Sequence, residues 1–112
     1  MAERNYVQRI TGELAARLPD CDPTLISLYA LLALEFGLEV DECMVHNAWA
    51  VWRNLTDPDH RSLIPFPFLA PEVQRLDTPY AQAIRAAVEA DRAATVREHA
   101  ARSPSPTLAK GC

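Results

Sequence analysis

The chain has 112 residues, of which 49% are hydrophobic and 23% are charged, and its formal net charge is −4 at pH 7. This length fits one domain, and this composition is typical of a folded globular chain and excludes a disordered one. The apolar stretch 25–34 is interrupted by Ser27 and is shorter than the roughly 20 residues that cross a bilayer, so we predict no membrane contact. Because the N-terminal residues lack the apolar block of a signal peptide, we expect a cytoplasmic protein.

Acidic residues are concentrated in the middle of the chain. Residues 20–59 carry eight acidic side chains against Arg53 alone, a net charge of −7. Residues 60–112 are only mildly basic, so the chain has no broad footprint for phosphates. This pattern disfavours nucleic-acid binding and favours a partner with a basic surface.

Two helices are predicted in the first third of the chain. Residues 3–18 carry apolar side chains at helical spacing, which predicts an amphipathic helix. A second helix begins at Pro23, with Asp22 as its cap, and ends at Gly37. The second helix is apolar on most sides, so we expect it at the centre of the core.

A third helix is expected from Asp41, its cap, to about Leu55. Its apolar stripe comprises Met44, Val45, Ala48, Trp49, Val51, Trp52 and Leu55. Aromatic side chains dominate small cores, so the two tryptophans are interpreted as core anchors. The alternative is that Trp49, Trp52, Phe66, Phe68 and Tyr80 line an aromatic pocket, as in nucleobase sites.

Residues 56–77 contain four prolines, which exclude a long helix and predict a long ordered linker. A short helical turn is expected at 71–76. The apolar side chains of the linker are too many to leave in water, so we expect it to wrap the helices and bury Leu63, Ile64, Phe66, Phe68 and Leu69.

The last helix is predicted from Thr78, as cap, to about Ala101, with solvated pairs Arg85–Glu89 and Glu98–Arg102. Residues 103–112 combine prolines and small polar residues and are expected to be disordered. The fold class is therefore all-α, with a single domain at 1–102, about four helices, and an ordered Pro-rich linker between the third and fourth.

The order of motifs in the second half of the chain resembles the RyR-type domain. The shared features are a Trp-containing helix, a histidine before an extended apolar run, and an aspartate before the last helix, here represented by His60, Leu63, Ile64, Pro65, Phe66, Leu69 and Asp77. The resemblance covers about 44–92. Some RyR-type domains bind adenine nucleotides or related small molecules, so the resemblance implies a nucleotide or metabolite sensor.

Two positions depart from the RyR-type pattern: Arg61 stands where that family usually has proline, and Pro67 with Phe68 replaces an acidic pair. Residues 25–88 are also similar to a family of small proteins from actinobacteria and their phages, which shares the Ala-Trp helix and the Pro-Asp-His linker. This second resemblance implies a fold and a phage or actinobacterial source, and no activity.

No complete catalytic or metal-binding constellation is present in the sequence. Cys43 and His46 can share a helix face, but two ligands do not make a metal site, and a half-buried thiol beside a hydrogen-bonded histidine is the favoured interpretation. The chain has three glycines, too few for a phosphate-cradling loop or a nucleophile elbow. We therefore predict no enzyme activity, no catalytic residue, no metal and no cofactor.

The polar cluster after the third helix has a local interpretation and a functional one. Locally, Asp57 starts a turn before Pro58, Asp59 accepts backbone hydrogen bonds, and His60 or Arg53 pairs with a carboxylate. The functional alternative is a small ligand or a cation. The local interpretation is favoured, because aspartates gather in turns for this reason.

The function favoured by the sequence is a non-enzymatic binding or adaptor module. Its predicted binding residues are Trp52, Arg53, Asp59, His60 and Phe66. The partner is a protein or a small molecule. The RyR-like sensor is the alternative, and a DNA-binding regulator is a weaker one because no basic recognition helix is present. The sequence leaves the oligomeric state open.

Overall fold

The computed structural model describes residues 4–101 and is built of helices, with no strand among these residues. The α-helices are α1 (Tyr6–Arg17), α2 (Pro23–Phe36), α3 (Glu42–Asn54), α4 (Pro71–Gln74) and α5 (Thr78–Ala101), and the 3-10 turns are η1 (Gly37–Glu39), η2 (Phe66–Phe68) and η3 (Arg75–Asp77). The predicted all-α class is confirmed: four long helices form the domain, with the proline-rich linker between α3 and α5. The predicted tail, 103–112, lies outside the described residues.

Local capping fixes where the first three helices begin. Asn5 and Gln8 form a reciprocal capping box at α1, so this helix starts later than predicted. The carboxylate of Asp22 accepts the backbone N–H of Thr24, and that of Asp41 accepts the N–H of Met44, as the sequence predicted.

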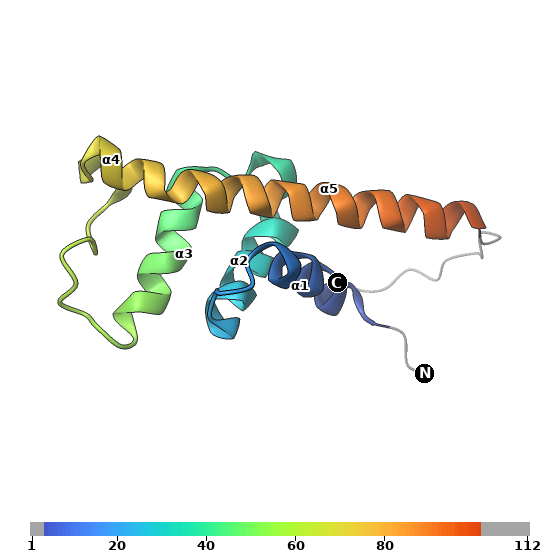
Figure 1. Ribbon diagram of the computed structural model, residues 1–112, viewed down its shortest axis with the longest axis horizontal. Coiled ribbons are helices and arrows are strands. Elements are labelled where there is room, and N and C mark those ends of the chain that lie inside the picture. The colour runs from blue at the N-terminus through green and yellow to red at the C-terminus, as the bar shows by residue number, and fades with distance from the viewer. Residues whose placement is uncertain (1–3, 102–112) are drawn as a thin grey trace, which may run out of the picture.

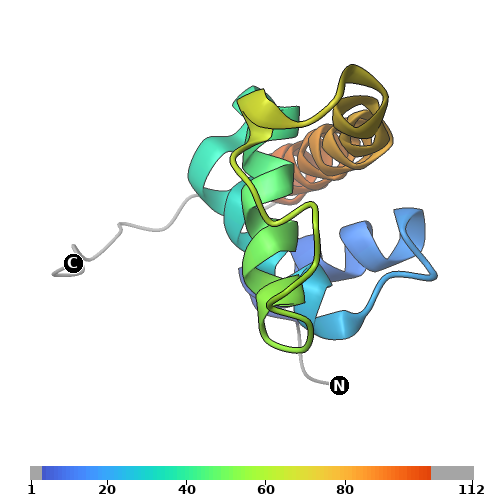
Figure 2. The ribbon, with the colours of Figure 1, turned by 90° about the vertical axis from the view of Figure 1, so that its left-hand side faces the viewer.

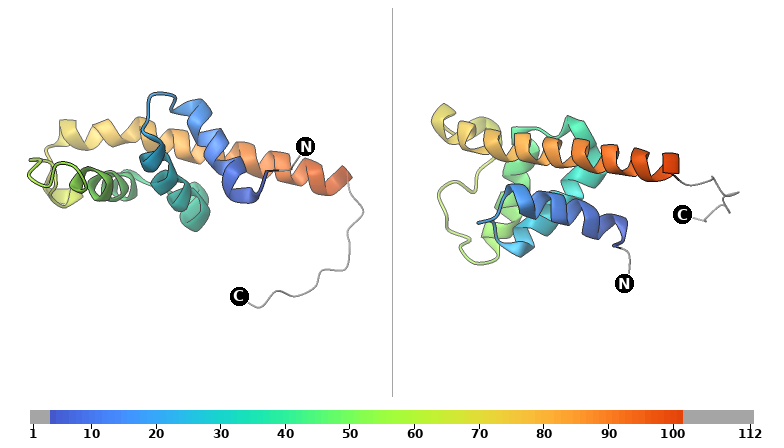
Figure 3. Two further views of the ribbon diagram at one scale, coloured as in Figure 1. Left: turned by 90° about the horizontal axis from the view of Figure 1, so that it is seen from below. Right: turned by 45° about the vertical axis from the view of Figure 1, so that its right-hand side comes forward.

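Helix α5 is the longest element, and the other long helices pack along it (Figure 1). Helix α1 lies beside its C-terminal half, α3 lies at its N-terminal end, and α2 contacts α1, α3 and α5 (Figure 3). The central place predicted for α2 is therefore correct. Its end is fixed by Gly37, whose φ of +57° suits a residue without a Cβ.

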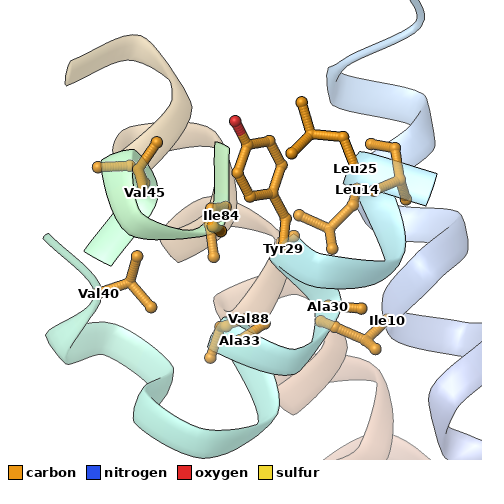
Figure 4. Close-up of a cluster of buried hydrophobic side chains, with 14 residues drawn as sticks. Ile10, Leu14, Leu25, Tyr29, Ala30, Ala33, Val40, Val45, Ile84 and Val88 are labelled. Atoms are coloured by element: carbon orange, nitrogen blue, oxygen red, sulfur yellow. The ribbon is translucent and has the colours of Figure 1, made fainter. Parts of the chain in front are cut away.

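The core is aliphatic and rich in alanine (Figure 4). Its buried residues are Ile10, Leu14, Leu25, Ile26, Tyr29, Ala30, Ala33, Val40, Val45, Ala48, Ala81, Ile84, Ala87 and Val88. Trp49 and Trp52 are only partly buried and pack against the edge of this cluster. The prediction that the tryptophans anchor the core is therefore only partly correct, because they border it.

The buried face of α3 is rotated from the predicted stripe. Val45 and Ala48 are buried, but Val51 is 58% exposed and Leu55 is 69% exposed. The side chain of His46 is 3% exposed and takes a place on the inner face. Hydrophobic periodicity missed this because a hydrogen-bonded histidine can be buried.

The linker runs outside α3 and returns to α4 (Figure 2). Of the apolar side chains expected to be buried there, Leu69 is buried, Leu63 and Phe66 are half-buried, and Ile64 and Phe68 are exposed by 42% and 75%. The expectation was wrong for Ile64 and Phe68. Neighbouring side chains of the linker and of the turn η2 point in different directions, so only some of them can face the helices.

Of the two pairs expected on α5, Arg85 contacts another segment, and Arg102 of the second pair lies outside the described residues. Glu98 accepts a hydrogen bond from Arg9 of α1 at 2.7 Å, and Arg9 Nε lies 3.7 Å from Asp91. Arg85 donates to the backbone carbonyl of Val40. These contacts join α5 to α1 and to the segment before α3. Within residues 4–101, no helix has the length and apolar character that a membrane span requires.

Replacing Ile84 by alanine should lower the free energy of unfolding by about 2–5 kcal/mol, because Ile84 is fully buried and its loss leaves a cavity. Urea unfolding followed by circular dichroism measures the change. Val96→Ala on the same helix is the control: Val96 is 67% exposed and its loss should cost less than about 0.5 kcal/mol. Equal effects of the two substitutions would contradict the assigned core.

Candidate functional site

A pocket of about 500 Å³ lies where the α1–α2 turn, α2, α3, the linker, η3 and the start of α5 meet. This volume is in the range of small-molecule sites. The wall is mainly apolar and aromatic, and its lining also includes three aspartates, two histidines, Cys21 and Ser62.

Four aromatic side chains from three helices form the pocket wall: Tyr29 of α2, Trp49 and Trp52 of α3, and Tyr80 of α5. The rings of Tyr29 and Tyr80 lie 6.1 Å apart at 43°, a tilted pair. Aromatic pairs at such distances stabilise each other, which helps to hold the wall in place.

Helix geometry places three ring side chains of α3 on one face. His46, Trp49 and Trp52 are spaced three residues apart, so they point in similar directions. The rings of His46 and Trp49 stack at 5.7 Å, and the edge of His60 meets Trp49 at 5.1 Å and 82°. His60 comes from the linker, so the linker supplies part of the wall.

A hydrogen bond from His46 anchors the linker to α3. Its Nε2 donates to the backbone carbonyl of Ile64 at 2.7 Å. Because a carbonyl can only accept, Nε2 carries the hydrogen, and neutral His46 has its lone pair on Nδ1. The predicted interpretation of His46 as a hydrogen-bonded histidine is confirmed, and the Cys43 thiol is half-buried as expected.

Three carboxylates lie around the pocket: Asp20 and Asp22 from the α1–α2 turn, and Asp77 from the end of η3. Asp20 and Asp22 are exposed, and Asp77 is half-buried. Burial raises the pKa of the Asp77 carboxyl, the charge of His46 opposes this rise, and Glu42 adds to it. The ionised form of Asp77 is therefore less favourable in the folded protein than in the unfolded chain.

Burial also changes the pKa values of two weaker acids that line the pocket, the Tyr29 hydroxyl and the Cys21 thiol. It raises the pKa of the Tyr29 hydroxyl, and the nearby Cys21 and Tyr80 add to the rise. Burial, with the charge of Asp22, raises the pKa of the Cys21 thiol. Both groups stay protonated at neutral pH, so Tyr29 is a phenol that can donate and accept, and Cys21 is a thiol and not a nucleophilic thiolate.

Two of the five predicted binding residues, Trp52 and His60, line this pocket. Arg53 does not line it: its guanidinium carbon lies 4.7 Å from the centre of the Trp52 ring and 6.0 Å from that of Trp49. This is a cation–π contact, in place of the predicted ion pair. Asp59 is exposed in the turn, outside the pocket.

The other predicted residue, Phe66, does not line this pocket, and its ring centre lies 6.0 Å from that of His46. Its carbonyl accepts a hydrogen bond from Gln74 Nε2 at 2.9 Å, which ties the linker to α4. Phe66 borders a second hollow, of about 370 Å³, beside Glu42 and Arg75. The pocket alternative for the aromatics is thus right for Trp49, Trp52 and Tyr80 and wrong for Phe66 and Phe68.

The turn after α3 matches the local interpretation in its backbone and differs in its side chains. The N–H of His60 donates to the carbonyl of Asp57 at 3.1 Å, which closes the predicted turn. His60 Nδ1 accepts the N–H of Ser62 at 3.0 Å, so His60 pairs with the backbone instead of a carboxylate.

Sequence reasoning missed Tyr29, Asp77 and the Asp20–Asp22 turn as pocket residues. One signal was available for Tyr29: it places a hydroxyl in the middle of an otherwise apolar stretch of α2, and a buried tyrosine hydroxyl usually requires a partner. The aspartates carried no such signal, because they join the pocket only through the packing of distant segments.

A family model described as a domain of unknown function (DUF7701) matches residues 5–89, which include every element of the pocket, and the chain belongs to this family. Comparisons with curated proteins and with solved structures find no match.

Asp77→Asn should raise the free energy of unfolding at pH 7, because asparagine keeps the shape without the buried charge. A raised pKa in the folded state means that the carboxyl stabilises the fold below its ordinary pKa of 3.8 and that this stability is lost as the pH rises through the folded-state pKa. The difference in free energy of unfolding between the variant and the natural protein should therefore widen from about pH 4 to pH 7, as urea titrations would measure.

Asp59→Asn is the matched control, since it removes the same charge from an exposed site and should change stability by less than about 0.5 kcal/mol. An Asp77→Asn protein that is less stable than the natural one at pH 7 would show that the carboxylate has a stabilising partner.

Proposed function

We propose that this member of a family of unknown function is a non-enzymatic binding module, whose pocket between α2, α3 and the start of α5 receives a small organic molecule or a side chain of a protein partner. The observation that carries the proposal is the combination of four aromatic walls with a buried phenol in one pocket of about 500 Å³. Apolar pockets with few convergent polar groups are the usual form of ligand sites.

The chemistry of the pocket supports binding over catalysis. Cys21 is held as a thiol, and Tyr29 is held as a phenol. The imidazole of His46 is engaged with the linker carbonyl at 2.7 Å, which leaves Nδ1 to accept a hydrogen bond. These groups can orient a ligand, and none of them forms a nucleophile–base pair.

The second candidate is the RyR-like nucleotide or metabolite sensor implied by the resemblance. The indole faces of Trp49 and Trp52 favour it, because aromatic rings can stack on a nucleobase. The carboxylates of Asp20, Asp22 and Asp77 oppose it, because they repel phosphates. A neutral nucleoside would fit this pocket better than a nucleotide.

DNA binding, cellular location and biological origin are inferred from the sequence. A DNA-binding regulator is the weakest candidate, since the pocket surroundings are acidic. A cytoplasmic location, and an origin in an actinobacterium or one of its phages, belong to the same proposal, and the neighbouring genes would test the origin.

A ligand that enters the pocket should change the tryptophan fluorescence of the protein, because the only two tryptophans, Trp49 and Trp52, both line it. We expect a compound from a small-fragment collection to give a saturable emission change and a raised melting temperature, since binding to the native state stabilises it. Ligand at about 100 times its Kd should add roughly 2.7 kcal/mol of stability.

The matched variants are Trp52→Phe, which shrinks the pocket wall and should weaken binding, and Phe68→Leu, which alters an apolar side chain that is 75% exposed and should leave binding unchanged. If no fragment, nucleoside or peptide changes either signal, the binding role is wrong.

A further inference from the structure

Negative side chains outnumber lysines and arginines in the pocket lining. The lining includes three carboxylates, Asp20, Asp22 and Asp77, and no lysine or arginine. None of these carboxylates has a basic side chain within ion-pair distance in the part of the chain that the structure describes; the ion pairs there involve Arg9 and Arg17. The field inside the pocket therefore favours a positive group.

The aromatic walls favour a cation for an independent reason. The faces of indole and phenol rings carry negative quadrupole potential, and they attract cations within about 6 Å of the ring centre. The fold already contains one such contact, because Arg53 lies 4.7 Å from the ring centre of Trp52. Arg53 itself is not among the residues that line the pocket.

Tyr29 adds a polar group to this pocket. Its side chain is 2% exposed and lines the pocket, and its hydroxyl is not one of the enclosed atoms of residues 4–101 that lack a hydrogen-bond partner. Figure 4 shows its oxygen at the border of the core cluster, directed away from Ala30, Ala33 and Val88. A phenol hydroxyl in this position can donate a hydrogen bond to a ligand or accept one from it.

The three carboxylates in the lining can only accept hydrogen bonds or pair with a positive group.

We propose that the pocket binds an alkylated organic ammonium group, held between the rings of Tyr29, Trp49, Trp52 and Tyr80 and neutralised by the carboxylate of Asp77. This inference rests on the binding role proposed above and specifies its ligand class. An alkylated ammonium suits a largely apolar wall better than a primary ammonium, which is strongly hydrated. The group can belong to a free small molecule or to a methylated lysine of a peptide.

The test is a titration of the full chain at constant ionic strength, followed by tryptophan fluorescence and calorimetry. The probes are choline, its neutral isostere 3,3-dimethylbutan-1-ol, and a short peptide with trimethyl-lysine beside the same peptide with unmodified lysine. Choline or the trimethyl-lysine peptide should bind at least about tenfold more tightly than its uncharged or unmethylated counterpart. Tighter binding of choline identifies a free small molecule as the source, and tighter binding of the peptide identifies a protein partner.

Two aspartate variants distinguish an effect of charge on ligand binding from an effect on the stability of the fold. Asp77→Asn should weaken binding of the cation by about tenfold while the protein becomes more stable at neutral pH, a combination that a merely structural role cannot give. Asp59→Asn removes the same charge from outside the pocket and should leave binding unchanged. Tyr29→Phe, which removes only the hydroxyl, should weaken binding by a smaller factor.

Equal binding of choline and its neutral isostere, or unchanged binding in Asp77→Asn, overturns the cation inference and leaves the binding role intact. If neither fragments nor cations change the tryptophan fluorescence, both the cation inference and the binding role are wrong.

Discussion

Close packing of helices around an alanine-rich core is the constraint on which the rest of this structure depends. Ala30 and Ala33 of α2, and Ala81 and Ala87 of α5, are all buried in the central cluster. Small side chains let helix axes approach closely, and such a core has little room for an indole. Trp49 and Trp52 are therefore placed at the edge of the core, where one side of each ring faces the pocket.

The linker forms the part of the pocket wall that the helices do not supply. The side chain of His46 donates to the carbonyl of Ile64, and that of Gln74 donates to the carbonyl of Phe66, so side-chain hydrogen bonds fix the linker backbone to α3 and to α4. These bonds place the ring of His60 against Trp49 and close one side of the pocket. The linker thus depends on polar anchors more than on the burial of its own apolar side chains, two of which stay exposed.

The pocket retains groups that a purely structural cavity would lack. The Asp77 carboxyl has a raised pKa through burial, so its ionised form is disfavoured in the fold, and a positive group beside it would compensate for this. The Tyr29 hydroxyl lines the same pocket.

Local signals in the sequence determined the class of fold and most helix boundaries: Asp22 with Pro23, Gly37 and Asp41 set their helix ends through capping and backbone preference, which act within a few residues. Two residues that the sequence proposed for binding, Trp52 and His60, line the pocket. Only the tertiary structure decided that α3 is rotated to bury His46, that Arg53 lies on the indoles, and that Phe66 is outside the pocket. It alone brought Tyr29, Asp77 and the Asp20–Asp22 turn together, because contacts between segments far apart in the chain depend on packing that no local pattern encodes.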